Sequence, residues 1–246
     1  MIAFSLLGPV RAWRDGAELP LGSPQQRTTL AVLLLREGLL TTMDELVDAI
    51  WPEDPPVAAV ATVRTYLSRL RRLLPIATGV RIDWIGGGYV LTAPEGALDV
   101  EVFRKHTARA AEAMRRDDKR DAIAHLRAAV ALHRGTPLAG AAGGYVDGQR
   151  ARLAELCRGA ALDLVALTVE TGGHTEAIAD LRAMVAEEPL RERCHALLMT
   201  ALYRGGRQAD ALAHYRQVRR TLADELGVEP TPELQALHQR ILLGAG

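Results

Sequence analysis

The stretch VRTYLSRLRRLL, residues 63–74, holds the clearest signal in this sequence. It carries four arginines within nine positions and no acidic residue, whereas the whole chain of 246 residues has 30 basic and 30 acidic residues. A solvated helix face usually alternates charges and gains stability from opposite charges four residues apart. An unopposed basic cluster in a neutral protein therefore points to an anionic partner.

A helical wheel separates this segment into two faces. The sequence predicts a helix over residues 57–74, ended by Pro75. Its arginines lie among small residues such as Ala61 and Ser68. Small residues let a helix enter a groove, and guanidinium groups suit phosphates and guanine edges. The arginine side favours DNA as the partner, with an acidic protein as the alternative. The opposite side is a stripe about 80° wide, formed by Val60, Val63, Leu67, Leu70 and Leu74.

Two further helices are predicted before this one. The first covers residues 23–38 and has Ser23 as its N-cap, with a proline at the first helical position. The second covers residues 42–51 and begins with a capping box made by Thr42 and Glu45. Both contain apolar residues at helical spacing, so three helices of modest length follow one another.

Short β-type segments flank the three helices. Residues 2–22 contain brief apolar stretches around an Asp15-Gly16 turn, and residues 80–94 alternate as two strands around Gly86-Gly87-Gly88. A small sheet, three helices and a final hairpin form a winged helix-turn-helix. A glycine tip without side chains allows close approach to a phosphate or the minor groove, and a merely flexible turn is the alternative.

From residue 98 onward the pattern is helical and repetitive. Residues 172–189 and 205–225 align with a period of 34 residues, and residues 120–135 supply a third copy. Small residues where helices cross and a period of 34 are typical of tetratricopeptide repeats. The copy at 120–135 precedes the copy at 172–189 by 55 residues, so a loop and a long helix over 139–169 fill the gap. We therefore expect a mainly α protein with small β elements: a winged helix over 1–95 and an all-α tetratricopeptide-like domain over 98–246.

Several classes of function find no support in the sequence. All seven histidines lie in the helical half, and none forms HExxH, a Cys/His cluster or a nucleophile elbow. Cys157 and Cys194 are isolated, and we expect two buried thiols. The apolar run at 30–35 is far shorter than the ~20 residues of a membrane span. We expect no enzyme, metal, cofactor or membrane segment, and a protein of the cytoplasm.

Sequence order and spacing resemble a known family. The segments LLGPVRAWRDG, LPLGSPQQRTTLAVLLL, ELVDAIWPEDPP, TVRTYLSRLRRLL and GGGYVL are similar to those of the Streptomyces antibiotic regulatory protein family. The run from Pro189 to Leu242 resembles the helical domain of the same family, so the similarity covers nearly all of residues 4–242. The family combines an OmpR/PhoB-type winged helix with a bacterial transcriptional activation domain.

The resemblance implies a DNA-binding transcriptional activator whose third helix lies in the major groove. It also implies roles for particular residues, carried over by position. The candidate base readers are Arg64, Thr65 and Ser68. The candidate phosphate contacts on the same helix are Arg69, Arg71 and Arg72. Further candidate DNA contacts are Gln26, Arg27, Thr41 and Thr42 at the helix starts and Gly87 and Gly88 in the wing.

One departure from the family affects the wing. Relatives often have an arginine before the wing glycines, where this chain has Ile85. Residues 1–97 contain nine arginines and ten acidic residues, so the DNA-binding half is not basic as a whole. The third helix is therefore expected to carry most of the contact, with an affinity that depends on salt through a few phosphates.

The resemblance also implies partners. Family members bind direct repeats in promoter DNA as side-by-side protomers or homodimers, and they recruit RNA polymerase holoenzyme. We expect a pathway-specific activator of a secondary-metabolite (antibiotic) gene cluster, associated with the nucleoid. The alternative is a tetratricopeptide-type adaptor that binds proteins and does not read DNA. An adaptor has no need for an acid-free basic helix followed by a wing.

Overall fold

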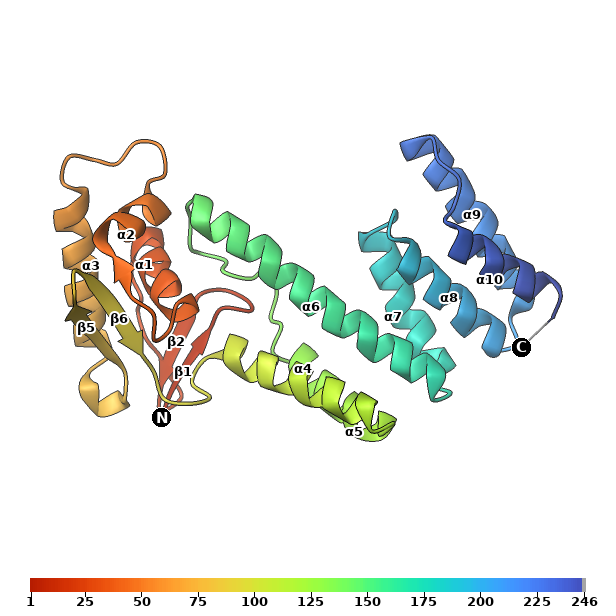
Figure 1. Cartoon of the computed structure of the whole chain (residues 1–246), viewed down its shortest axis with the longest axis horizontal. Coiled ribbons are helices and arrows are strands. Elements are labelled where there is room, and N and C mark those ends of the chain that lie inside the picture. Colours follow the sequence, from red (N-terminus) through yellow and green to blue (C-terminus); the bar gives the residue numbers. More distant parts are fainter. Residues whose placement is uncertain (245–246) are drawn as a thin grey trace. The chain divides into compact units, whose positions relative to one another are not determined.

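The computed structural model describes residues 1–244 and contains two compact units (Figure 1). The first comprises Met1–Glu112 and Ala124–Ala160, and the second comprises Ala113–Ile123 and the chain from Ala161 onward. The architecture is mainly helical, with small sheets near the N-terminus, as the sequence predicted. The units differ from the segments 1–95 and 98–246, and that division into domains stays a prediction.

The chain begins with a small antiparallel sheet. Strands β1 (Ile2–Ser5), β2 (Arg11–Arg14) and β3 (Ala17–Glu18) lie in the order β1-β2-β3. Asp15 and Gly16 both have positive φ, at 52° and 85°. Two successive left-handed residues give the tight turn that matches the twist of a hairpin. The Asp-Gly turn read from the sequence is therefore confirmed.

The first two helices begin where their caps predict. Helix α1 (Pro24–Leu35) follows Ser23, whose side chain accepts a hydrogen bond from the Gln26 backbone N–H. Helix α2 (Met43–Ile50) follows Thr42, which forms a capping box with Glu45. The backbone N–H of Thr42 and the Arg36 guanidinium both donate to the Glu45 carboxylate and lower its pKa. Both N-terminal signals in the sequence were correct.

Helix α3 (Ala59–Leu73) places its apolar stripe against α1 and α2. Val63, Leu67 and Leu70 are buried, as predicted. Val60 was assigned to this stripe, but its side chain is 40% exposed. It lies at the edge of the stripe and in the first turn of a helix that starts at Ala59 instead of residue 57. The buried stripe is therefore narrower than the wheel indicated.

A second sheet forms the wing, which we define as β5 (Arg81–Ile85), β6 (Gly88–Thr92) and their turn. A short 3₁₀ helix, η1 (Ile76–Thr78), connects α3 to it. The strand order is β4-β6-β5, because the two-residue strand β4 (Thr41–Thr42) also pairs with β6. The glycines at 86 and 87 have φ of 57° and 94° and make the turn. The hairpin was predicted, whereas β4 was not.

The first compact unit continues well past the wing. It includes most of α4 (Asp99–Arg115), the second half of α5 (Lys119–Val130) and the first part of α6 (Gly144–Glu170), the long helix expected in the gap between repeats. The Asp99 carboxylate accepts hydrogen bonds from the backbone N–H groups of Leu6 at 2.9 Å and Leu7 at 3.0 Å. Burial raises the pKa of Asp99, while these hydrogen bonds oppose the rise. The start of α4 is thus fastened to the segment after β1.

A second connection joins α1 to the segment before α6. The Thr28 hydroxyl donates to the Ala142 carbonyl at 2.7 Å and accepts from the Ala142 N–H at 3.0 Å. The next residue, Gly143, has φ of 122°, and a Cβ there would lie 2.2 Å from the Ala49 carbonyl oxygen. Backbone from the segment after α5 therefore packs directly on α1 and α2.

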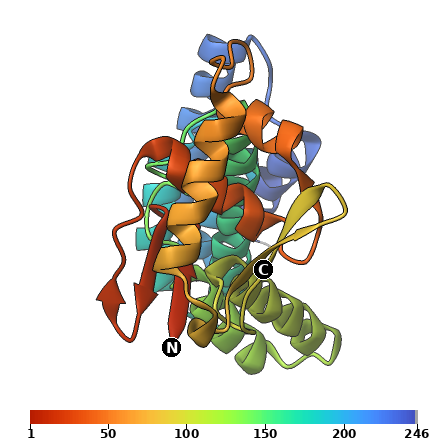
Figure 2. The same cartoon turned by 90° about the vertical axis from the view of Figure 1, so that its left-hand side faces the viewer.

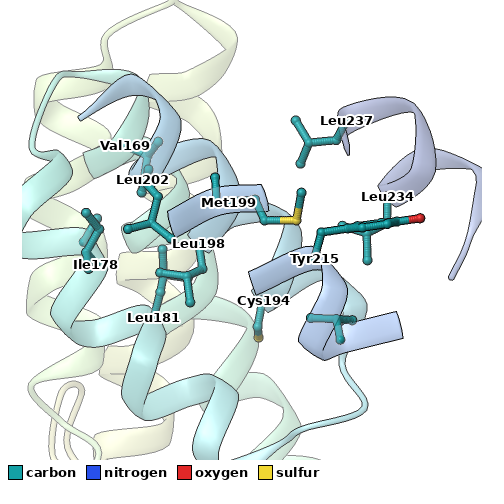
Figure 3. Packing of buried hydrophobic residues seen from close by; sticks show 14 of the residues in the cluster. Val169, Ile178, Leu181, Cys194, Leu198, Met199, Leu202, Tyr215, Leu234 and Leu237 are labelled. Carbon is teal, nitrogen blue, oxygen red and sulfur yellow. The ribbon is translucent and has the colours of Figure 1, made fainter. Parts of the chain in front are cut away.

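The second unit contains a stack of antiparallel helices around one core (Figure 3). Its elements are α7 (His174–Glu187), α8 (Glu192–Arg204), α9 (Gln208–Leu226) and α10 (Pro232–Leu242). Ala177 and Ala211, one repeat apart, are both 0% exposed. Leu181 and Tyr215, also one repeat apart, belong to the same buried cluster and are labelled in Figure 3. Small residues let the helices approach closely, as expected for tetratricopeptide-like packing.

Candidate nucleic-acid interface

The solvent side of α3 carries the candidate DNA-contacting residues. Figure 2 shows α3 across the face turned toward the viewer, with the wing beside it. The helix has no acidic residue in its first turn and has two arginines in its last turn. All of the candidate side chains on this helix are exposed. We call the following exposed set the arginine face: Arg64, Thr65, Ser68, Arg69 and Arg72.

The arginines of this face have no internal partners. Among the described residues, Arg64, Arg69 and Arg72 form no ion pair. Arginines elsewhere pair with carboxylates, as Arg219 does with Glu229 at 2.7 Å. Three unpaired guanidinium groups on one exposed helical face form a concentrated positive surface, although the chain as a whole is neutral.

Thr65 lies within the arginine face and has a defined hydrogen-bonding state. Its hydroxyl donates to the carbonyl of Ala61 at 2.9 Å, one turn earlier. The hydroxyl oxygen can therefore accept a hydrogen bond from a base amino group, and the γ-methyl group remains available for apolar contact. These are the contacts suited to adenine or cytosine amino groups and to the thymine methyl group.

Arg71 differs from its neighbours on α3. Its Nε donates to the Ile82 carbonyl in β5 at 2.8 Å, and its guanidinium carbon lies 5.5 Å from the centre of the Tyr89 ring. Tyr89 is buried in the hairpin, as expected of the wing tyrosine. The sequence grouped Arg71 with the phosphate contacts, and the structure shows an exposed side chain whose Nε is bonded to the wing. The helical wheel does not separate Arg71 from Arg64, so only the contact with β5 distinguishes it from the other arginines.

Two candidates before the helices are corrected by their burial. The side chain of Gln26 is 2% exposed and that of Thr41 is 0% exposed, so neither can reach a phosphate. Gln26 lies against Gly22, and Thr41 pairs with Tyr89 in the second sheet. Local sequence identifies a helix start, but it does not reveal which polar residues near that start are covered by the fold.

The remaining candidates are partly accessible, with one exception. Arg27 is half-buried, and its guanidinium lies close to Gly140. Thr42 is half-buried and accepts the Glu45 N–H. Gly87 is exposed, whereas Gly88 is buried, and a Cβ on Gly88 would lie 2.7 Å from the Thr41 carbonyl. Gly88 is therefore required for packing on β4, which corrects its assignment as a DNA contact.

Cys157, in α6, is a buried free thiol. Burial raises the pKa of the Cys157 thiol to about 11, so it stays protonated and unreactive at neutral pH. No group of three or more potential metal ligands occurs among residues 1–244. Within the same residues, every helix is too short or too polar to cross a membrane.

Two histidine pairs were not foreseen from the sequence. His106 and His125 lie with their Nδ1 atoms 3.1 Å apart in the first unit. In the second unit, His195 Nδ1 and His214 Nε2 are 3.0 Å apart, and His195 Nε2 is 2.9 Å from the Pro189 carbonyl. Because a carbonyl only accepts, His195 Nε2 carries a proton and His214 Nε2 donates to His195. Burial lowers the pKa of both histidines of this second pair.

Comparisons with known proteins agree with this geometry. Residues 16–91 match the model described as "Transcriptional regulatory protein, C terminal", and residues 98–242 match the "Bacterial transcriptional activator domain". Regulatory protein DnrI of Streptomyces peucetius is 31% identical over 97% of this chain and 91% of its own length. The chain belongs to the Streptomyces antibiotic regulatory protein family of transcriptional regulators.

Other relatives of this family member are longer. Regulatory protein AfsR of Streptomyces coelicolor is 50% identical over 98% of the chain, and the match spans 24% of AfsR. A solved structure of Mycobacterium tuberculosis EmbR in complex with a low affinity phosphopeptide superposes with a TM-score of 0.93 at 34% identity. That match covers 100% of this chain and 66% of EmbR. This family member thus spans about a quarter of the AfsR length.

Proposed function

We propose that this regulator binds double-stranded DNA through the arginine face and activates transcription from the bound promoter. The observation that carries the proposal is an exposed, acid-free face on α3 with three unpaired guanidinium groups. Together with the wing beside it, this face has the form of a winged helix that enters the major groove. Both matched family models describe transcriptional regulators, which supports the same conclusion.

The geometry suggests separate tasks for the residues of the face. Arg64, Thr65 and Ser68 are the proposed base readers, because all three side chains are exposed on α3 and the family resemblance assigns this role to their positions. Arg69 and Arg72 are the proposed phosphate contacts, since each offers an unpaired guanidinium near an edge or an end of the helix. We assign DNA binding to residues 1–95 and the contacts with other proteins to residues 98–246.

The biological setting of the proposal follows from the family. The promoter sites are direct repeats in a secondary-metabolite gene cluster, occupied by side-by-side protomers that recruit RNA polymerase holoenzyme. The activator domain matched over residues 98–242 supports the last step. The protein acts on the nucleoid in the cytoplasm and has no catalytic role.

Binding measurements in rising salt test the proposal. Selection from a pool of random duplexes supplies a preferred site, and fluorescence anisotropy compares that site with random DNA. The slope of log K against log salt becomes shallower by about 0.9 for each phosphate that is no longer neutralised, so Arg72→Gln flattens the slope by about that amount. Arg64→Ala instead reduces the preference for the selected site by roughly 5- to 150-fold. Arg220→Gln, on the exposed surface of α9, is the control and leaves both quantities unchanged.

The outcomes separate the proposed activator from an adaptor that binds only proteins. Absence of duplex binding at low salt by the natively folded protein refutes the proposal. If Arg64→Ala and Arg72→Gln weaken binding to selected and random DNA equally, the division into base readers and phosphate contacts is wrong.

A further inference from the structure

The wing offers an apolar tip in place of a charged one. Trp84 is 52% exposed and Ile85 is 54% exposed, at the end of β5 just before the turn. The only charged side chains of the hairpin, Arg81 and Asp83, pair with each other at 3.0 Å. The wing therefore has no unpaired positive charge for a phosphate, although it lies beside the arginine face.

A continuous set of contacts connects α3 to this tip. Arg71 donates from Nε to the Ile82 carbonyl at 2.8 Å and lies over the Tyr89 ring. The Tyr89 ring contacts Trp84 edge to face, with ring centres 4.8 Å apart and planes at 69°. A guanidinium held by a directional hydrogen bond and by a ring face has little freedom to turn toward a phosphate. This set of contacts connects the wing to α3, while the pairing of β6 with β4 holds the other side of the hairpin.

We propose that Arg71 is a positioning residue that fixes the wing beside α3, and that Trp84 and Ile85 bind DNA by apolar contact in the minor groove. The inference rests on the proposed function and adds residues to its interface. Minor-groove proteins commonly place apolar side chains against base steps and sugars. Continuity with the arginine face favours DNA as the occupant, because Arg71 links the two surfaces directly. Such a contact adds affinity without adding salt dependence.

Variants of the full chain test the positioning role of Arg71. Ile85→Ser weakens binding to the selected duplex about 5- to 10-fold, the effect expected when a partly buried apolar side chain is removed. Arg71→Gln weakens binding by a similar factor through displacement of the wing. Both variants keep the salt slope of the natural protein, whereas Arg72→Gln flattens it by about 0.9. The double variant Arg71→Gln/Ile85→Ser has the same affinity for the selected duplex as whichever single variant binds it more weakly. The effects do not add, because both changes act on the same part of the interface.

Two further measurements distinguish positioning from a phosphate contact. Arg71→Lys retains the charge but lacks the planar Nε–H group, so it does not restore affinity. Hydroxyl-radical protection in the minor groove disappears in Arg71→Gln and Ile85→Ser, while protection of guanine N7 by α3 remains. Circular dichroism confirms that each variant is folded.

Specific results would overturn the inference. A flatter salt slope for Arg71→Gln, with full rescue by Arg71→Lys, would make Arg71 a phosphate contact. Unchanged binding of Ile85→Ser, or additive effects in the double variant, would remove the wing tip from the interface. If the natural protein fails to bind any duplex, the proposed function itself fails and this inference fails with it.

Discussion

The hydroxyl bridge between Thr28 and Ala142 should contribute measurably to the stability of the first compact unit. Thr28→Val keeps the shape of the side chain and removes both hydrogen bonds to Ala142, at 2.7 and 3.0 Å. Each hydrogen bond contributes a net ~0.5–1.5 kcal/mol, so the free energy of unfolding should fall by about 1–3 kcal/mol.

The neighbouring residue supplies a matched control. Thr29 is also 0% exposed and lies on the same helix, but its hydroxyl donates only to the Gln25 carbonyl within α1. That carbonyl keeps its helical hydrogen bond when the hydroxyl is removed. Thr29→Val should therefore reduce stability by roughly 0.5 kcal/mol or less.

Urea unfolding followed by tryptophan fluorescence measures the difference. All three tryptophans, at positions 13, 51 and 84, lie in the first compact unit, so the signal reports its unfolding. Unchanged m-values would show that the surface exposed on unfolding is the same in both variants. If Thr28→Val and Thr29→Val agree within about 0.5 kcal/mol, the bridge does not hold α1 to the segment before α6.

Two other predictions concern acid stability and a glycine. Burial, together with the nearby His195 in α8 and Arg182 in α7, lowers the pKa of His214 from 6.5 to about 4. The folded state therefore binds fewer protons than the unfolded state, so stability is constant above pH ~6.5 and falls as the pH drops toward 4. Circular dichroism melts should show this decrease, and His214→Gln should make it shallower, whereas His133→Gln, at an exposed position, should not. Gly143→Ala should destabilise the protein by about 2–4 kcal/mol, because its Cβ meets the Ala49 carbonyl at a positive φ. Gly148→Ala, in α6 with open space around it, should be neutral or slightly stabilising in the same urea unfolding experiment.

Much of the fold follows from local signals that act within a few residues. Ser23 and Thr42 are positioned to cap helices, and the Asp15-Gly16 pair suits a left-handed turn. The 34-residue period identifies buried alanines such as Ala177, because close helix packing excludes larger side chains. The arginine side of α3 could also be found from the sequence, because helical periodicity alone separates it from the core.

The rest depends on contacts between residues far apart in the sequence. Thr41 is buried because it pairs with Tyr89, 48 positions later, and a two-residue strand leaves no periodic pattern. Arg71 looks like its neighbours in the sequence until β5 brings the Ile82 carbonyl to it. The extension of the first unit beyond residue 97 likewise rests on Asp99 and Thr28, whose partners are distant backbone groups.

The unpaired cations of the arginine face are all guanidinium groups, and this has a consequence for control of the protein. The only lysines of the chain, Lys105 and Lys119, lie outside α3 and pair with carboxylates. Guanidinium keeps its charge at every physiological pH, and lysine acetylation has no target on this surface. Neither acidity nor acetylation can therefore neutralise these cations, so the surface keeps its affinity for an anionic partner under either change.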